Sequence, residues 1–368
     1  MLYLDHAATT PLRDVAREAW LEASTAFNPG GQYSVGRAAR AALEGARETI
    51  ASCLGCEPIE VIFTSSGTEA DNLAVQGLFA ASPLRRVICS PIEHSAVREP
   101  VKALDADVTW LSIAASGHAV VDPEIFAQPA ALATCMLANN ETGAIQPVAE
   151  LAELAAATST PFHVDAVQAV GHIPVDFAAL GVTTLAASAH KFGGPRGSGF
   201  LIAKRSPAPN PLLRGGGQER GLRSGTPDVA SAVATAAALK EAVGELESEH
   251  RRLSQLRDEL LRTVAQVDNV RIHTAEPALP GHAYFSVVGA EGDSLIMLLD
   301  ARGVAAATGS ACSNGVNRAS ETLLAMGVSE HDARGALRLT LGRPTENVDE
   351  FIDVFADVVK RARNAGMA

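Results

Sequence analysis

A lysine in the middle of the chain has neighbours that suit covalent chemistry. Lys191 follows the apolar run Leu185-Ala186-Ala187 and precedes Gly193 and Gly194. Apolar surroundings lower the pKa of a lysine ammonium, and the neutral amine can form a Schiff base with an aldehyde. The commoner alternative is a lysine whose ammonium reaches the surface. Lys191 is therefore a candidate only if other parts of the chain could bind the aldehyde compound.

A short motif upstream could bind a phosphate group. Thr64-Ser65-Ser66-Gly67-Thr68-Glu69 follows an apolar run and opens a helical pattern. Ser66 and Glu69 have the spacing of a capping box, and Gly67 lets backbone N–H groups approach an anion at the positive end of a helix. A capped helix after a strand is also ordinary architecture, so the motif alone leaves both interpretations open.

A carboxylate lies between these two motifs in the sequence. Phe162-His163-Val164-Asp165 reads as a strand that ends in an aspartate, with Gln168 shortly after it. An ionised carboxylate here could pair with a protonated ring nitrogen and keep the ring electron-withdrawing. The alternative is a helix N-cap. Phosphate motif, carboxylate and lysine follow in that order, each where a strand is expected to end.

Apolar runs rich in β-branched residues alternate with helical patterns around these motifs. The segment 35–54 keeps its apolar residues at a 3.6-residue period, which predicts a helix. The runs that we predict as strands are 61–63, 86–89, 108–111, 134–137 and 162–164. This alternation predicts an α/β fold with a largely parallel sheet. Ligands of such sheets bind at the carboxyl ends of the strands.

A smaller unit follows a long helical stretch that begins after Pro227. In this unit we expect strands at 270–273, 283–288 and 336–341, and helices at 291–302 and 347–363. We predict a large domain over residues 13–249. Residues 1–12 plus 250–368 would form a small α+β domain, which carries a loop at about 307–320.

Composition narrows the class of protein. The chain has 368 residues with 30 basic and 42 acidic side chains, so its net charge is −12, and neither nucleic acid nor an anionic membrane is an expected partner. No stretch approaches the ~18 apolar residues that span a bilayer, and Asp5 interrupts any signal peptide. Five cysteines indicate free thiols in a reducing compartment, so we expect a cytoplasmic protein.

The histidines give no sign of a metal site. No histidine pair has metal-ligand spacing, and we expect no metal. We therefore interpret His6, His118, His172 and His331 as ordinary loop or surface residues.

Further motifs are spread over the whole chain. They are Tyr3-Leu4-Asp5-His6-Ala7-Ala8-Thr9-Thr10-Pro11, Glu93-His94, Ala138-Asn139-Asn140-Glu141-Thr142-Gly143, His163-Val164-Asp165-Ala166, Gly215-Gly216-Gly217-Gln218-Glu219-Arg220, Arg223-Ser224-Gly225-Thr226, Gly309-Ser310-Ala311-Cys312 and Arg338-Leu339-Thr340-Leu341-Gly342-Arg343. In this order they resemble the cysteine desulfurase family. These enzymes depend on pyridoxal 5'-phosphate (PLP) and have the aspartate-aminotransferase fold, PLP-dependent transferase fold type I.

The resemblance implies a role for each matching position. Lys191 would hold the cofactor covalently, Asp165 would pair with the pyridine nitrogen, Gln168 would bond the ring hydroxyl, and His94 would stack on the ring and serve in proton transfer. Four residues would bind the phosphate: Gly67, Thr68, Ser188 and His190. Thr226 would reach the phosphate from a second subunit, which implies a homodimer. The substrate would be bound by Asn140 and Arg338, with the Arg338 guanidinium on its carboxylate.

Cys312 distinguishes desulfuration from ordinary aminotransferase chemistry. It lies in a stretch of small residues with two glycines, which is typical of a surface loop. The resemblance implies that its thiolate takes sulfur from L-cysteine as a persulfide, leaves L-alanine, and passes the sulfur to an acceptor for iron–sulfur clusters or other sulfur-containing cofactors. Selenocysteine lyase, a non-catalytic PLP-binding paralogue and an aminotransferase are the alternatives.

The chain departs from the family pattern in places. Asn28-Pro29-Gly30-Gly31-Gln32-Tyr33 stands where the family has Asn-Pro-Ser-Ser-x-His, and Asn317-Arg318-Ala319-Ser320 replaces Leu-Glu-Pro-Ser. The last predicted helix lies close to residue 368, where housekeeping members have a tail that docks an iron–sulfur scaffold. The sequence therefore leaves the identity of the sulfur acceptor open.

Overall fold

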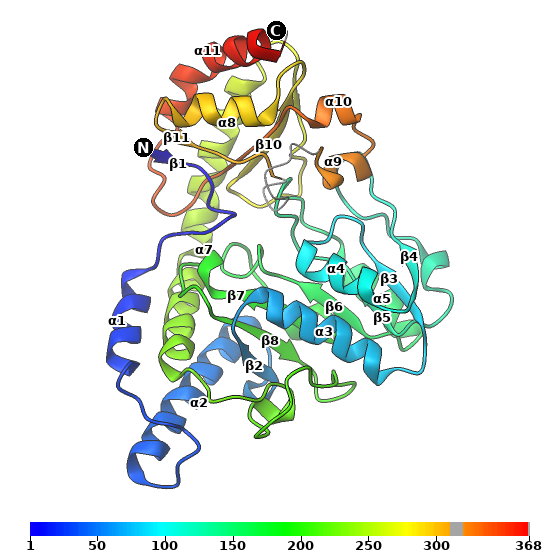
Figure 1. Cartoon of the computed structure of the whole chain (residues 1–368), viewed down its shortest axis with the longest axis vertical. Helices are drawn as coiled ribbons and strands as arrows, with labels where there is room; N and C mark the ends of the chain where they lie inside the picture. Colours follow the sequence, from blue (N-terminus) through cyan, green and yellow to red (C-terminus); the bar gives the residue numbers. More distant parts are fainter. Residues whose placement is uncertain (310–318, 367–368) are drawn as a thin grey trace.

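A mixed sheet of seven strands forms the centre of the larger part of the molecule (Figure 1). The computed structural model describes residues 1–309 and 319–366. The strand order is β2-β8-β7-β6-β5-β3-β4. The strands are β2 (Val61–Thr64), β3 (Arg86–Cys89), β4 (Asp107–Trp110), β5 (Leu132–Thr134), β6 (Phe162–Asp165), β7 (Thr184–Ser188) and β8 (Gly199–Ala203). Within this sheet β8 runs antiparallel to its neighbours β7 and β2 and the other pairs are parallel, so the predicted, mainly parallel sheet is confirmed.

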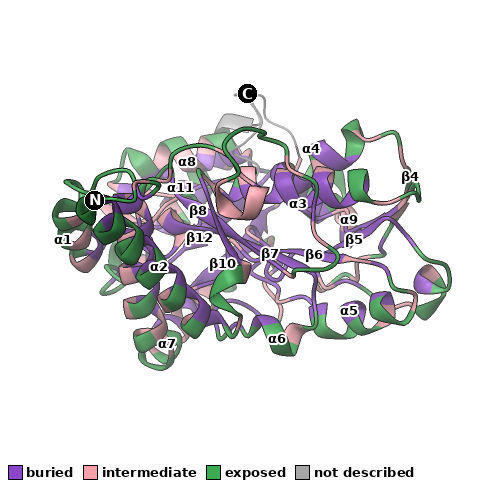
Figure 2. Cartoon of the chain, turned by 90° about the horizontal axis from the view of Figure 1, so that it is seen from below, coloured by how far each residue is buried: buried purple, intermediate pink, exposed green. Residues whose placement is uncertain are grey.

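Helices cover both faces of this sheet. Figure 2 shows the buried strands between α3 and α4 on one side and α5 and α6 on the other. The helices of this part are α1 (Asp14–Ala23), α2 (Ser34–Leu54), α3 (Gly67–Ala81), α4 (Ser95–Ala103), α5 (Val148–Ala157), α6 (Phe177–Leu180) and the 3₁₀ turns η1 (Pro58–Glu60), η2 (Pro123–Phe126), η3 (Ala189–Lys191) and η4 (Glu219–Gly221). Because both faces are covered, β5 to β8 are buried along their whole length.

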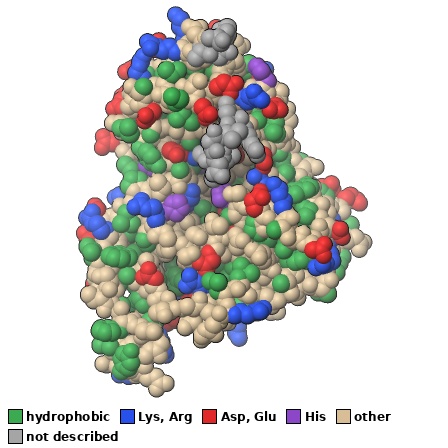
Figure 3. Space-filling view, viewed as in Figure 1, with side chains coloured by type: hydrophobic (Ala, Val, Ile, Leu, Met, Phe, Trp, Pro, Cys, Tyr) green, Lys and Arg blue, Asp and Glu red, His purple; other side chains and the backbone are tan. Residues whose placement is uncertain are grey.

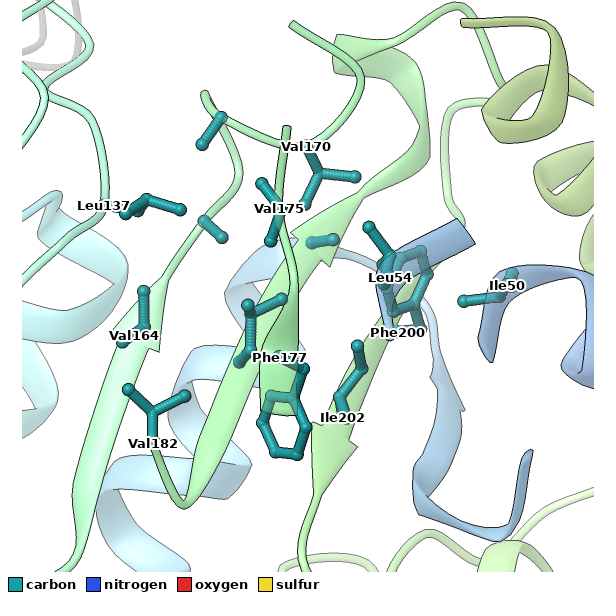
Figure 4. Close-up of a cluster of buried hydrophobic side chains, with 14 of the residues drawn as sticks. Ile50, Leu54, Leu137, Val164, Val170, Val175, Phe177, Val182, Phe200 and Ile202 are labelled. Atoms are coloured by element: carbon teal, nitrogen blue, oxygen red, sulfur yellow. The ribbon is translucent and has the colours of Figure 1, made fainter. Parts of the chain in front are cut away.

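The main core includes the buried face of α2. In Figure 4, Ile50 and Leu54 of α2 lie close to Phe200 of β8, and Phe177 lies near Ile202. Ile50 belongs to the apolar stripe from which we predict a helix over 35–54, and the helix spans Ser34–Leu54. The amphipathic period therefore locates this helix correctly, because its apolar stripe is the face that packs into the core.

The smaller part is built on a three-stranded antiparallel sheet in the order β12-β10-β9. Its strands and helices are β9 (Val270–Ile272), β10 (His282–Val287), β12 (Ala336–Thr340), α8 (Gly292–Asp300), α9 (Glu321–Ala325), α10 (Glu330–Ala333) and α11 (Asp349–Gly366). The strand β1 (Leu2–Tyr3) pairs in parallel with β11 (Val304–Ala305), a pairing that the sequence does not predict. Residues near the start of the chain therefore pack with residues from its last quarter.

A single helix, α7 (Val229–Val264), runs from the larger part into the smaller one (Figure 1). It begins after Pro227, as predicted, and the Asp228 side chain caps it by accepting the Ser231 N–H. One hydrophobic cluster gathers residues between 16 and 279, and a second gathers residue 4 with residues between 253 and 362. The boundary at 249/250 falls inside α7 and stays a prediction.

Within the described parts of the chain, no helix is long and apolar enough to cross a membrane. Residues 1–309 and 319–366 also hold no group of three or more His, Cys, Asp or Glu side chains that could bind a metal ion.

Cys89 and Cys135 are buried among the core residues. Cys53 and Cys56 lie on either side of Gly55, the residue that ends α2 in a left-handed conformation.

A buried histidine in the smaller part gives the protein a testable dependence of stability on pH. His273 is 8% exposed, with Nε2 2.9 Å from the Ser286 hydroxyl. Burial, with a smaller contribution from Arg271, lowers the pKa of His273 to about 4, whereas an unfolded histidine titrates near ~6.5. Between these values the unfolded chain binds one more proton than the folded chain. The free energy of unfolding therefore falls as pH drops through this window, by up to ~1.4 kcal/mol per pH unit.

We expect His273→Gln to remove this part of the pH dependence. The measurement is the free energy of unfolding by denaturant between roughly pH 6 and pH 4.5, where the variant should show the shallower slope because glutamine does not titrate. Equal slopes in the two proteins would contradict the lowered pKa of His273.

Candidate active site

Many of the predicted site residues line one pocket at the carboxyl end of the parallel strands. They are Gly67, Thr68, His94, Asn140, Asp165, Gln168, Ser188, His190 and Lys191. The cavity between these residues measures about 130 Å³. Residues far apart in the sequence share this site because parallel strands end at the same edge of the sheet.

The N-terminus of α3 forms one end of the pocket. The Ser66 side chain caps the helix by accepting the Glu69 N–H at 3.1 Å. A Cβ atom on Gly67 would lie 2.7 Å from Val167 Cγ2 and 3.1 Å from Ser188 Cβ, so a side chain at this position would clash. The backbone at Gly67 therefore lies close to Val167 and Ser188. The positive N-terminal end of α3 lies at the pocket, where it suits an anion.

The capping box predicted from Ser66 and Glu69 is only half formed. The Glu69 carboxylate accepts the N–H of Ser65, not of Ser66, at 2.7 Å and pairs with Arg223 Nε at 2.8 Å. Arg223 belongs to the segment that leads to Thr226, so this acid links the phosphate motif to that segment. The spacing in the sequence predicts the local cap, but the second partner of Glu69 comes from a distant part of the chain.

A buried carboxylate ends β6 within the pocket. Asp165 is 4% exposed, and its Oδ1 accepts the Val167 N–H at 2.9 Å. This bond closes a turn, and the next helix in the chain begins only at Phe177, so the helix-cap alternative is wrong. Burial raises the pKa of Asp165, and the nearby His94 opposes that rise. A cationic partner in the pocket would favour the ionised form of Asp165.

Lys191 enters the pocket from η3, directly after β7. It is half-buried, and its Nζ donates to the carbonyl oxygens of Ala7 at 2.5 Å and Ala8 at 3.1 Å. Its backbone carbonyl lies 2.9 Å from Nε2 of His172. The alternative of a lysine that extends to the surface is wrong, because the amine points toward the N-terminal segment.

Arg338 lies on β12 and joins the smaller part to the pocket. It is 4% exposed, with Nη2 2.7 Å from Asp5 Oδ1 and Nη1 donating to the Asn140 carbonyl at 3.0 Å. Its Nε is buried and has no hydrogen-bond partner within the described residues. The sequence contains Asp5 in a motif but gives no sign of this pairing, because 333 positions separate the two residues.

Two expectations from the sequence, those for Thr226 and Cys312, stay predictions, and the one for His6 is wrong. Thr226 is exposed and does not line the pocket of its own chain. Cys312 lies outside the described residues. His6, expected as an ordinary loop or surface residue, is buried against Tyr3 with Nδ1 3.0 Å from the Thr10 hydroxyl, and burial lowers its pKa to about 4. Local sequence context could not reveal that the segment around His6 packs against β12.

Comparison with known proteins identifies the family. The model of the aminotransferase class-V family matches residues 2–351. An IscS-like cysteine desulfurase from Mycobacterium tuberculosis is 46% identical to this chain over 387 residues, which cover 100% of this chain and 98% of that protein. The chain belongs to the cysteine desulfurase family. The resemblance in the sequence motifs is therefore confirmed.

Solved structures that are similar to this chain share its fold. A NifS-like protein aligns with a TM-score of 0.88 at 32% identity, over 99% of this chain and 98% of that one. SspA in complex with cysteine aligns with a TM-score of 0.79 at 29% identity, over 95% of this chain and 100% of that one. The predicted fold type I is confirmed by these likenesses and by the mainly parallel sheet.

Cysteine desulfurases depend on PLP, and the pocket fits this cofactor. Because Gly67 has no side chain, the backbone N–H groups at the N-terminus of α3 are accessible to the phosphate. The buried Asp165 carboxylate suits a protonated ring nitrogen, and the amine of Lys191 lies at the same pocket for the aldehyde. The chemistry of these three groups matches three polar parts of PLP.

Proposed function

We propose that this protein is a cysteine desulfurase that converts L-cysteine to L-alanine and takes the sulfur onto Cys312. The observation that carries the proposal is the convergence of Lys191, Asp165 and the N-terminus of α3 on one pocket, with Arg338 beside it. The likeness to SspA in complex with cysteine supports L-cysteine as the substrate.

Different residues of the pocket would bind different parts of the cofactor. When bound, PLP supplies a ring that accepts electrons from the substrate carbon. Lys191 Nζ would hold the cofactor, and Asp165 would keep the ring nitrogen protonated. Gln168 lines the same pocket and would bond the ring hydroxyl, while Thr68, Ser188 and His190 would join Gly67 at the phosphate.

The hydrogen bond of His94 defines which of its ring nitrogens carries the proton. Its Nδ1 accepts the Ala96 N–H at 3.1 Å. Burial lowers the pKa of His94, which favours the neutral ring. A neutral ring whose Nδ1 is an acceptor carries its proton on Nε2. We therefore assign Nε2 of His94 as the ring atom that would donate a hydrogen bond within the pocket.

Sulfur transfer to Cys312 balances without an added oxidant. As the Cys312 thiolate attacks the substrate sulfur, a sulfur–sulfur bond forms and the substrate carbon–sulfur bond breaks. The electron pair stays with the carbon, which takes up a proton and leaves as L-alanine. Cys312 is left as a persulfide, from which an acceptor protein for iron–sulfur cluster or other sulfur-cofactor synthesis would take the sulfur.

The cytoplasm is the compartment that we propose for this reaction. The chain has an odd number of cysteines, five, and the four that lie in the described residues are free thiols. Thiols persist in a reducing compartment, and a persulfide carried on Cys312 would be released there to its acceptor.

A homodimer would complete the site. Thr226 is exposed and away from its own pocket, so it is available to the phosphate of a second subunit.

Hydrophobic side chains are also exposed around the connection between α1 and α2: Leu21, Phe27, Tyr33 and Val35. Figure 3 shows hydrophobic atoms at the corresponding lower left end of the molecule. Exposed apolar patches of this kind are typical of subunit contacts, and light scattering after gel filtration measures the mass directly.

The test of the activity is product analysis with the PLP-loaded protein. We expect L-cysteine with a reductant to give L-alanine and sulfide in equal amounts. Release of selenide from L-selenocysteine without sulfide from L-cysteine would favour a selenocysteine lyase. A keto acid in place of L-alanine would indicate an aminotransferase, and no product from either amino acid would indicate a non-catalytic PLP-binding protein.

Removal of Arg338 should weaken substrate binding. We expect Arg338→Ala to raise KM for L-cysteine by roughly 30-fold or more, because a desolvated charge pair is worth about 2 kcal/mol or more. Exposed Arg334 offers the matched control, and Arg334→Ala should leave KM unchanged. If KM for L-cysteine is the same in Arg338→Ala and wild type, Arg338 does not bind the substrate carboxylate.

A further inference from the structure

A buried glutamate beside the pocket collects hydrogen bonds from side chains of the smaller part. Glu141 follows the pocket residue Asn140 and is 9% exposed. Its Oε2 accepts hydrogen bonds from the hydroxyls of Tyr284, at 2.8 Å, and Ser320. Its Oε1 accepts the Thr322 hydroxyl at 3.0 Å. Hydrogen bonds from hydroxyls to a carboxylate are stronger than those between neutral groups. The cluster therefore stabilises the packing of the smaller part against the turn that carries Glu141.

The groups around Glu141 bracket residues 310–318. Ser320 and Thr322 come shortly after this segment and are 1% and 4% exposed. On the other side, a Cβ atom on Gly309 would lie 3.0 Å from both Glu141 Oε2 and the Tyr284 hydroxyl oxygen. Gly309 has a φ of +89°, so its backbone packs against the cluster in a conformation that favours glycine. The Glu141 carboxylate therefore bonds to residues after the segment, and its partner Tyr284 reaches the chain before it, with the hydroxyl oxygen 3.5 Å from the Thr308 carbonyl oxygen.

The turn that carries Glu141 is itself fixed to the pocket. Asn139 Oδ1 accepts the N–H groups of Glu141 and Thr142, each at 2.9 Å. Asn139 Nδ2 donates to the Ile92 carbonyl at 3.2 Å, close in sequence to the pocket residue His94. The next residue, Asn140, lines the pocket and its carbonyl accepts Arg338 Nη1. The position of the Glu141 carboxylate is thus set relative to the substrate site.

We infer that Glu141 is a positioning residue, which holds both ends of the segment that contains Cys312 against the wall of the substrate pocket. The inference rests on the proposed desulfurase function. Holding the two ends of a segment limits the space that its residues explore, which raises the effective concentration of a group within it near a neighbouring site. Glu141 therefore sets the rate at which Cys312 meets the substrate sulfur, without itself contacting the substrate.

Two variants test this positioning role: one changes the acceptor of the hydrogen bonds, and the other changes a donor. Glu141→Gln keeps the side-chain volume and removes one acceptor oxygen. Thr322→Val keeps the shape of threonine and removes one donor, and it leaves Asn140 untouched. Thr160→Val is the matched control, because Thr160 is a buried threonine that accepts the Ala130 N–H at the opposite end of the strands. All three are measured as the PLP-loaded enzyme.

We expect both cluster variants to slow persulfide formation on Cys312 by ~10-fold, the usual size of a lost bond to a charged group. KM for L-cysteine and the visible absorbance of the cofactor should stay as in wild type, and Thr160→Val should match wild type throughout. Rapid mixing with L-cysteine followed by mass spectrometry measures the persulfide. A rise in KM as large as the fall in kcat would overturn the inference, because Glu141 would then act by shaping the substrate pocket.

Amide hydrogen exchange separates this inference from the proposed function. We expect peptides that cover residues 305–309 and 319–325 to exchange several-fold faster in Glu141→Gln and Thr322→Val than in wild type and Thr160→Val. If the wild-type protein releases no L-alanine from L-cysteine, the desulfurase proposal fails while the exchange result still decides whether Glu141 holds these flanks. Unchanged exchange in both variants overturns the positioning role whatever the activity shows.

Discussion

Lys191→Ala is expected to lose the visible absorbance of covalently held PLP together with turnover of L-cysteine. The amine at the end of η3 is the group that would hold the cofactor aldehyde, and its loss also removes a site for proton transfer at the substrate carbon. Proton transfer by a positioned side chain contributes ~10²–10⁴-fold to rate, so we expect a loss of at least this size. Absorbance spectra and L-alanine release measure the two effects.

The control for Lys191 is another lysine bonded to a backbone carbonyl. Lys204 donates to the Gly181 carbonyl at 3.2 Å and does not line the pocket. We expect Lys204→Ala to keep both colour and turnover. Should the Lys191→Ala protein remain yellow and active after dialysis, Lys191 cannot be the residue that holds the cofactor.

Cys312→Ala is expected to stop release of both L-alanine and sulfide from L-cysteine while the cofactor absorbance stays as in wild type. Without the thiolate there is no acceptor for the substrate sulfur, so the carbon–sulfur bond is not broken and neither product forms. Product analysis with a reductant present measures both compounds, and the absorbance spectrum shows whether the cofactor site is intact.

Cys56 provides the matched control for Cys312. Burial, with a smaller contribution from Glu60, raises the pKa of the Cys56 thiol to about 12. A thiol with this pKa is protonated at neutral pH and is a poor nucleophile, so Cys56→Ala should match wild type. A Cys312→Ala protein as active as wild type would mean that the enzyme needs no cysteine acceptor, and a selenocysteine lyase or another PLP lyase would replace the proposed function.

Local sequence patterns place much of the secondary structure well. The period of apolar residues predicts α2 within one residue, and Pro227 marks the start of α7. These features depend on neighbours in the sequence, because helix periodicity and capping are local properties. The sequence does not predict the antiparallel strand β8, because a short buried run such as Gly199–Ala203 has no alternation that distinguishes a strand from a piece of buried helix.

Local periodicity and motifs in a fixed order are enough to predict the α/β fold, the family and the candidate residues at the ends of strands. Which polar groups meet depends instead on how distant segments pack. Asp5 pairs with Arg338 across 333 positions, and Glu141 binds Tyr284 across 143 positions and Ser320 across 179. Such contacts form only when the smaller part packs over the edge of the larger sheet, and no local pattern encodes the distance between two segments that meet in this way.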